Sequence, residues 1–152
     1  MRALETEAML NQAIGQFWRG LIQHHSHLGL IASFGLSKLA DTMQARIADE
    51  PQTLRSLLAR LLDLGGTPEF SVSTPTLGTD LGTIFSINID SQRAGLAMLN
   101  QCVLFAGNQS DAATRLLFER IVLDEEEHLA WLLGEQSLLT RLGEVAYTAL
   151  RA

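Results

Sequence analysis

Apolar residues recur every three or four positions along most of the chain, which is the period of one face of an α-helix. The first stripe ends at Gly35 and contains Leu10, Ile14, Phe17, Leu21, His24, Leu28 and Ile31. The second ends at Gly65-Gly66 and contains Leu39, Met43, Ile47, Glu50, Leu54, Leu57 and Leu61. Glycine tolerates the left-handed backbone that terminates many helices. We therefore predict two successive long helices, with Pro51 causing a kink in the second.

The second half of the chain repeats this arrangement after a Gly-, Pro-, Ser- and Thr-rich connection from Gly65 to about Thr79. A third helix is predicted from the stripe Phe85, Ile89, Gln92, Leu96, Leu99 and Val103. A turn then offers Ser110 or Asp111 as the N-cap of a fourth helix, from about Ala112 to Leu139. Gly143 separates a short last helix, Glu144 to Leu150.

Only the middle connection is long enough to run back along a bundle. We therefore predict an all-α protein, a four-helix bundle with one long crossover and a short C-terminal fifth helix. At 152 residues, the chain is most simply one domain that spans residues 1–152.

Composition and charge exclude several classes of function. A net charge of −6 opposes nucleic-acid binding, which needs clustered Lys and Arg. No apolar run approaches a membrane span, and the acidic start does not resemble a signal peptide. The single cysteine, Cys102, has apolar neighbours and is expected to be an inert core thiol. These features predict a cytoplasmic protein with no nucleic-acid or membrane partner.

Glu125 and His128 are the most informative residues of the chain. They stand three positions apart in Asp124-Glu125-Glu126-Glu127-His128-Leu129, on the same helix face as apolar neighbours. A carboxylate and an imidazole that face a core need a partner, and Glu-x-x-His in a helical bundle is typical of metal binding. Glu50 and Gln92 hold corresponding polar positions near the middle of the second and third stripes.

The chain resembles a bacterioferritin subunit, a member of the ferritin-like class of di-iron bundles, over nearly its whole length. The resemblance is most specific in three segments: residues 124–132 with Trp131, the Leu61-Leu62-Asp63-Leu64-Gly65-Gly66-Thr67-Pro68 exit of the second helix, and the tail 143–150. It implies an iron-storage cage of twenty-four subunits built from dimers, with a mineral core.

The same resemblance implies that this chain has lost half of a di-iron centre. Glu50, Glu125 and His128 stand where the family has ligands, whereas Phe17, Thr53 and Gln92 replace a glutamate, a histidine and a glutamate. The family's haem methionine, which follows the second-helix glutamate, is here Pro51, so haem is not expected from this chain.

Charge counting limits what the remaining residues can hold. Two carboxylates neutralise one divalent ion, and the imidazole and the amide oxygen are neutral ligands. We therefore predict a site for at most one metal ion at Glu50, Glu125, His128 and Gln92. The alternatives are an internal ion pair or exposed acidic turn at Glu125 and His128, or a fuller site completed by His24.

The other histidines of the first helix have plainer expected roles. His24 shares the stripe of Phe17 but lies two turns, about 10 Å, farther along, which favours a core or hydrogen-bonding role. His25 and His27 point away from that stripe and are expected at the surface.

Three functions fit this sequence. The first is a homomeric iron-storage cage with a residual single-metal site. The second is a structural subunit with weak or absent ferroxidase activity that co-assembles with a catalytic, haem-binding relative, and the lost ligands favour it. The third is a helical-bundle cage or partner-binding protein with no role in iron.

Overall fold

Helices account for the regular structure of the protein. The computed structural model describes residues 2–152, and within them six helices follow one another: α1 (Arg2–Ser33), α2 (Ser37–Ile47), α3 (Glu50–Asp63), α4 (Leu81–Asn108), α5 (Ala112–Leu142) and α6 (Glu144–Arg151). The described part of the chain contains no strand. The predicted all-α fold is confirmed.

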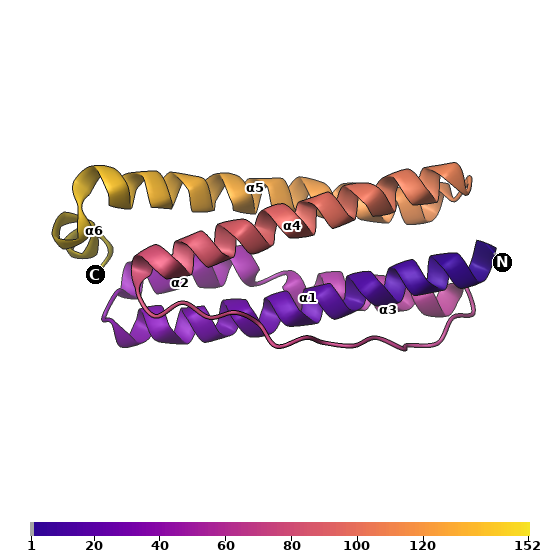
Figure 1. Cartoon of the computed structure of the whole chain (residues 1–152), viewed down its shortest axis with the longest axis horizontal. Helices are drawn as coiled ribbons and strands as arrows, with labels where there is room; N and C mark the ends of the chain where they lie inside the picture. Colours follow the sequence, from indigo (N-terminus) through magenta and orange to yellow (C-terminus); the bar gives the residue numbers. More distant parts are fainter. Residues whose placement is uncertain (1) are drawn as a thin grey trace.

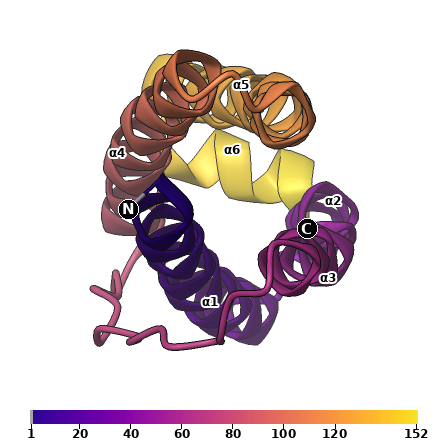
Figure 2. The same cartoon turned by 90° about the vertical axis from the view of Figure 1, so that its right-hand side faces the viewer.

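The long helices form a four-membered bundle (Figures 1 and 2). The first member is α1, which packs against both α4 and the α2–α3 segment, while α5 packs against α4 and α3. The connection between α3 and α4 runs back along α1, as Figure 1 shows, so that α4 is parallel to α2 and α3. This is the predicted crossover, and α6 lies across one end of the bundle.

The predicted second helix is broken rather than kinked. Between α2 and α3 the chain makes a turn at Ala48 and Asp49, and Pro51 lies in the first turn of α3. Proline lacks an N–H donor and is tolerated in that turn, where the N–H would have no helical acceptor. The break makes Glu50 the first residue of α3, where the helix dipole favours a negative charge.

Helix ends follow the turn chemistry of the sequence. Gly35 and Gly65 have positive φ angles of 79° and 76°, the backbone that L-residues rarely adopt. Asp111 caps α5, because its carboxylate accepts a hydrogen bond from the Thr114 N–H. Of the two predicted N-caps, Asp111 is therefore correct and Ser110 is not.

The apolar core consists of two clusters along the bundle. One contains Leu10, Ala13, Ile14, Leu54, Leu57, Leu61, Leu99, Cys102, Phe118 and Ile121. The other contains Ile31, Leu36, Leu39, Met43, Leu81, Ile84, Phe85, Ile89, Leu132 and Tyr147. On every long helix the polar residues singled out from the sequence lie between members of the two clusters. Cys102 is buried as expected, and burial raises the pKa of its thiol to about 11.

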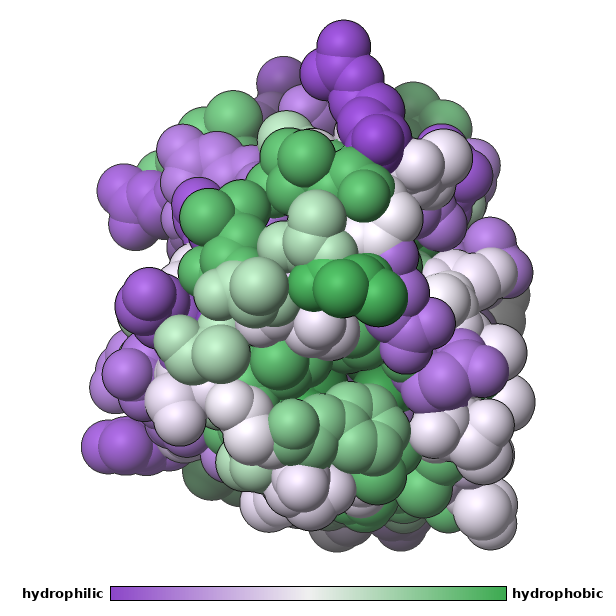
Figure 3. Space-filling model, turned by 90° about the vertical axis from the view of Figure 1, so that its left-hand side faces the viewer, coloured by the Kyte–Doolittle hydropathy of each residue, from purple (hydrophilic) through white to green (hydrophobic). Residues whose placement is uncertain are grey.

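A carboxylate-centred contact fixes α6 to α5. Glu135 accepts hydrogen bonds from the Tyr147 hydroxyl at 2.5 Å and from Arg151 Nε and Nη2 at 2.9 and 2.7 Å. Figure 3 shows the end of the molecule at which α6 lies, where apolar side chains gather in the middle of the face. Exposed apolar residues of α6 and of the adjoining helix ends include Phe34, Leu142, Val145 and Leu150.

Candidate functional site

Five polar side chains meet between the two apolar clusters. His24 comes from α1, Glu50 from the start of α3, Gln92 from α4, and Glu125 and His128 from α5. All except the half-buried Glu125 are buried. Each side chain is therefore largely removed from water and needs a partner inside the protein or a bound ligand.

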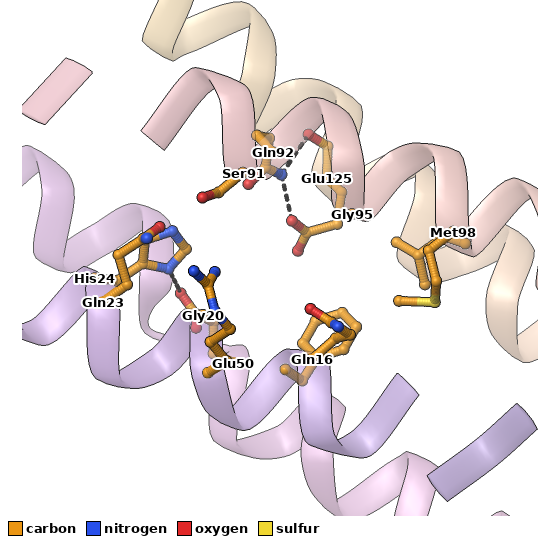
Figure 4. Close-up of a pocket in the computed structure, with 13 residues that line it drawn as sticks. Gln16, Gly20, Gln23, His24, Glu50, Ser91, Gln92, Gly95, Met98 and Glu125 are labelled. Carbon is orange, nitrogen blue, oxygen red and sulfur yellow. Dashed lines mark hydrogen bonds and ion pairs between the residues drawn. The ribbon is translucent and has the colours of Figure 1, made fainter. Parts of the chain in front are cut away.

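Glu50 is paired with His24. The Nδ1 of His24 lies 2.7 Å from Glu50 Oε1, and Figure 4 shows the two side chains joined across the space between α1 and α3. A carboxylate can only accept, so the hydrogen bond requires the proton to be on Nδ1. Burial by itself lowers the pKa of His24, but the hydrogen bond and charge of Glu50 outweigh it and raise the pKa.

Glu125 is paired with Gln92. The Gln92 amide donates to the Glu125 carboxylate and, at 3.0 Å, to the Glu125 backbone carbonyl, so two helices are joined by one side chain (Figure 4). Burial raises the pKa of Glu125 to about 7, although the hydrogen bond from Gln92 lowers it, and the nearby charge of Glu50 adds to the increase.

His128 is surrounded by aromatic rings and positive charge. Its ring centroid lies 5.3 Å from that of His24 and 6.3 Å from that of Trp131, and the Arg46 guanidinium lies 5.9 Å from the Trp131 ring centroid. Burial lowers the pKa of His128 to about 4, with further contributions from the charges of His24 and Arg46. The His128 imidazole is therefore neutral at pH 7.

Two hollows reach the site. One, of about 70 Å³, lies between α1 and α4 and includes Phe17, Gly20, Gln23, Gly95 and Met98 in its wall. The other, of about 200 Å³, is lined at the α2–α3 break and on α5 by Arg46, Asp49, Asp124 and Glu127. Both include Glu50 and Glu125, so the two paired carboxylates lie where the hollows approach each other.

The donor set does not fit a centre of two metal ions. Phe17 offers no ligand atom, and the Thr53 hydroxyl lies 3.4 Å from the Asp49 carbonyl, within its own helix turn. Among the described side chains, no group of three or more His, Cys, Asp or Glu is arranged so that it could hold a metal ion. Binding of one ion by Glu50, Glu125, His128 and Gln92 stays a prediction, and the ion would compete with the two hydrogen-bonded pairs for the carboxylates.

The structure corrects the expected position of His27. His25 is exposed as predicted, but His27 is only 1% exposed. Its Nδ1–H donates to Asn88 Oδ1 at 2.7 Å, and its Nε2 accepts from the Gly78 N–H at 2.9 Å. The ring thus fixes the crossover to α1 and α4. The helical stripes do not indicate this role, because they reflect contacts between helices, whereas His27 also contacts the crossover at Gly78.

His24 is the residue of the site whose role the sequence left open. The axial distance from Phe17 favoured a hydrogen-bonding role, and the contact with Glu50 confirms it. The partner could not be identified from the stripes, because it depends on the break between α2 and α3 that places Glu50 at a helix start.

The bundle has four members joined by one long crossover, and polar side chains from all four members meet near its middle. This combination defines the class of ferritin-like bundles. The comparison with known sequences agrees: residues 7–142 match the ferritin-like domain of the ferritin family. The chain belongs to this family.

The similar proteins are bacterioferritins. The bacterioferritin of Mycobacterium leprae is 25% identical over 142 residues, which cover 93% of this chain and 89% of that protein. The structure of the Mycobacterium tuberculosis bacterioferritin BfrA has a TM-score of 0.92 at 25% identity and covers 97% of this chain. The match covers 94% of the BfrA chain. The predicted resemblance to bacterioferritin is confirmed.

A third similar protein shows the fold alone. The bacterioferritin of Rhodobacter capsulatus, described with a metal-free dinuclear site and haem iron, has a TM-score of 0.91 at 22% identity, with 98% and 94% of the two chains covered. Family membership supports the expectation of an iron-storage cage subunit. In residues 2–152, no helix is long and apolar enough to cross a membrane.

Proposed function

We propose that this chain is a structural subunit of an iron-storage cage, with weak or absent ferroxidase activity of its own. It co-assembles with a catalytic, haem-binding subunit of the same family. Family membership supports the cage, and the chemistry of the bundle centre supports the structural role.

The observation that carries this proposal is the pairing of both remaining carboxylates. Glu50 is hydrogen-bonded to His24, and Glu125 to Gln92. Oxidation of Fe(II) at a di-iron centre requires carboxylates that are free to bind and neutralise two adjacent ions. Here two carboxylates remain, both have protein partners, and Phe17 offers no third.

Co-assembly is supported by what the chain has lost and by what it has kept. Pro51 offers no ligand atom for haem, whereas the bundle, the crossover and α6 are intact. The apolar face at the end with α6 remains exposed, and such a face on a soluble chain is typical of a contact surface between subunits. The chain thus retains the parts that build a shell rather than those that oxidise iron.

The decisive experiment measures Fe(II) oxidation per subunit by the chain purified alone. We expect a rate near that of Fe(II) in buffer, and a large increase in a Phe17→Glu/Thr53→His/Gln92→Glu variant, which restores the family's ligands. Native mass spectrometry after co-expression with a catalytic bacterioferritin should detect mixed shells. Rapid oxidation by the unmodified chain would refute the structural role, and exclusively homomeric shells would refute co-assembly.

A second candidate is a homomeric cage with one metal ion bound at Glu50, Glu125, His128 and Gln92. The arrangement of the hollows favours this candidate. Glu50 and Glu125 line one hollow together with His128 and the other hollow together with Gln92. Metal analysis of the protein as isolated, compared with a Glu125→Ala variant, tests it. One equivalent of metal that disappears in the variant would favour this candidate.

A further inference from the structure

Two basic side chains lie where a metal ion would have to bind. His24 contacts Glu50 directly, and Arg46 lines the same hollow as Glu50, Glu125 and His128. The positive charge of Arg46 is held in place by the face of Trp131, beside His128. The region that a divalent cation would neutralise therefore contains cationic or proton-donating groups of the chain itself.

Both carboxylates also accept a hydrogen bond from the protein. His24 donates to Glu50, and Gln92 donates to Glu125, so each of the two acids has a protein donor. Removal of the partner of a buried carboxylate strongly destabilises a fold, because the charge that is left behind is not compensated. In a ferritin-like bundle the usual partner is the metal. In this chain the partner of Glu50 is an imidazole from the neighbouring helix.

A bound metal would have to overcome this arrangement. An ion at Glu50 would compete with the Nδ1–H of His24 for the carboxylate, and an ion near His128 would lie in the hollow that Arg46 also lines. Like charges in a partly buried site repel each other. The same residues that satisfy Glu50 thus oppose the entry of a cation.

We propose that His24, assisted by Arg46, takes the place of the metal ion at the centre of the bundle, so that the subunit is fully folded without metal. The inference deepens the proposed function and rests on it, because a subunit that does not oxidise iron has no need of an ion at this position. His24 is a positioning residue in this proposal: it holds Glu50 and, through it, the start of α3.

The test is a metal rescue. In chelator, the assembled His24→Ala protein should unfold roughly 6–10 °C below the unmodified protein, because Glu50 loses its buried partner. Addition of Co(II) or Zn(II) should restore most of this loss, and Co(II) should give a ligand-field absorption band. The unmodified protein should show neither a shift nor a band. His24→Asn, which keeps an N–H donor, should need no metal.

Two control variants test whether the effect depends on the contact between His24 and Glu50. His25→Ala removes an exposed histidine of the same helix and should leave the unfolding temperature and the metal response unchanged. In a His24→Ala/Glu50→Gln protein the buried charge is gone, so metal should no longer rescue stability.

Three outcomes would overturn the inference. They are a cobalt band in the unmodified protein, an unchanged stability of His24→Ala in chelator, and a loss of stability that metal does not restore. These outcomes are separate from those that test the proposed function, because rapid Fe(II) oxidation would refute the latter whatever the cobalt spectra show.

Discussion

Replacing Glu125 with glutamine should expose a pH dependence of stability that the unmodified protein conceals. Burial raises the pKa of Glu125 from 4.5 to about 7, so in the folded state it holds a proton that the unfolded chain lacks between these values. This stabilises the fold at low pH, and the contribution is lost as pH rises through 7. Glu125→Gln removes this contribution and keeps an amide oxygen that can accept from Gln92.

His128 acts in the opposite direction. Burial, together with the charges of His24 and Arg46, lowers its pKa from 6.5 to about 4, so the unfolded chain holds the extra proton. This stabilises the fold above pH 6.5, and the contribution is lost as pH falls toward 4. Between pH 6 and pH 5 the folded state binds about 0.8 proton more than the unfolded state at Glu125 and about 0.8 proton fewer at His128. The two effects on the free energy of unfolding therefore cancel.

Without Glu125, the effect of His128 should be unopposed. One proton corresponds to about 1.4 kcal/mol per pH unit, so the variant should lose about 1 kcal/mol more than the unmodified protein from pH 6 to pH 5. For a chain of this size, that is a further fall of roughly 2–4 °C in unfolding temperature, measurable by circular dichroism. Glu126→Gln, an exposed neighbour, is the matched control. Equal pH responses of Glu125→Gln and the control would refute the reasoning.

Three further predictions test other contacts. His27→Leu breaks two buried hydrogen bonds and leaves Asn88 Oδ1 without its donor. It should therefore destabilise the protein by about 3 kcal/mol and increase amide hydrogen exchange in the crossover. Unchanged exchange there would contradict the anchoring role. Glu135→Ala should cost about 2 kcal/mol, reduced by the partial exposure of Arg151, and make α6 more sensitive to proteolysis. Gly15→Ala would place its Cβ 2.4 Å from a crossover carbonyl and should destabilise the protein, whereas Gly29→Ala, with open space around it, should raise the unfolding temperature. An equal response of the two glycines would show that the crossover does not constrain α1.

The helical pattern was sufficient to predict the fold because the signal is local. Helix stripes, the glycines at their ends and the one long connection all depend on nearest neighbours along the chain, and each agrees with the structure. The exception is the second helix. Pro51 was expected to bend it, but the chain starts a new helix there, because an unsatisfied N–H is avoided when proline occupies the first turn.

Within the site, the sequence identified which residues face the centre but not which of them pair. Glu50, Gln92, Glu125 and His128 do line the hollows at mid-bundle, as their stripe positions indicated. The pairing of His24 with Glu50 depends on the rotation of α1 against the start of α3, and that of Gln92 with Glu125 on the contact of α4 and α5. Neither pairing can be predicted from the periodicity of the sequence, because each depends on how two helices pack.

The sequence by itself determined the helical fold, the order of the bundle members and the membership of the bundle class. It also led to the prediction that Phe17, Thr53 and Gln92 replace metal ligands. Only the tertiary structure decided what the surviving Glu50 and Glu125 do instead. The physical reason is that a buried carboxylate binds whichever donor packing brings within hydrogen-bonding distance. Here that donor comes from a neighbouring helix, far away in the chain.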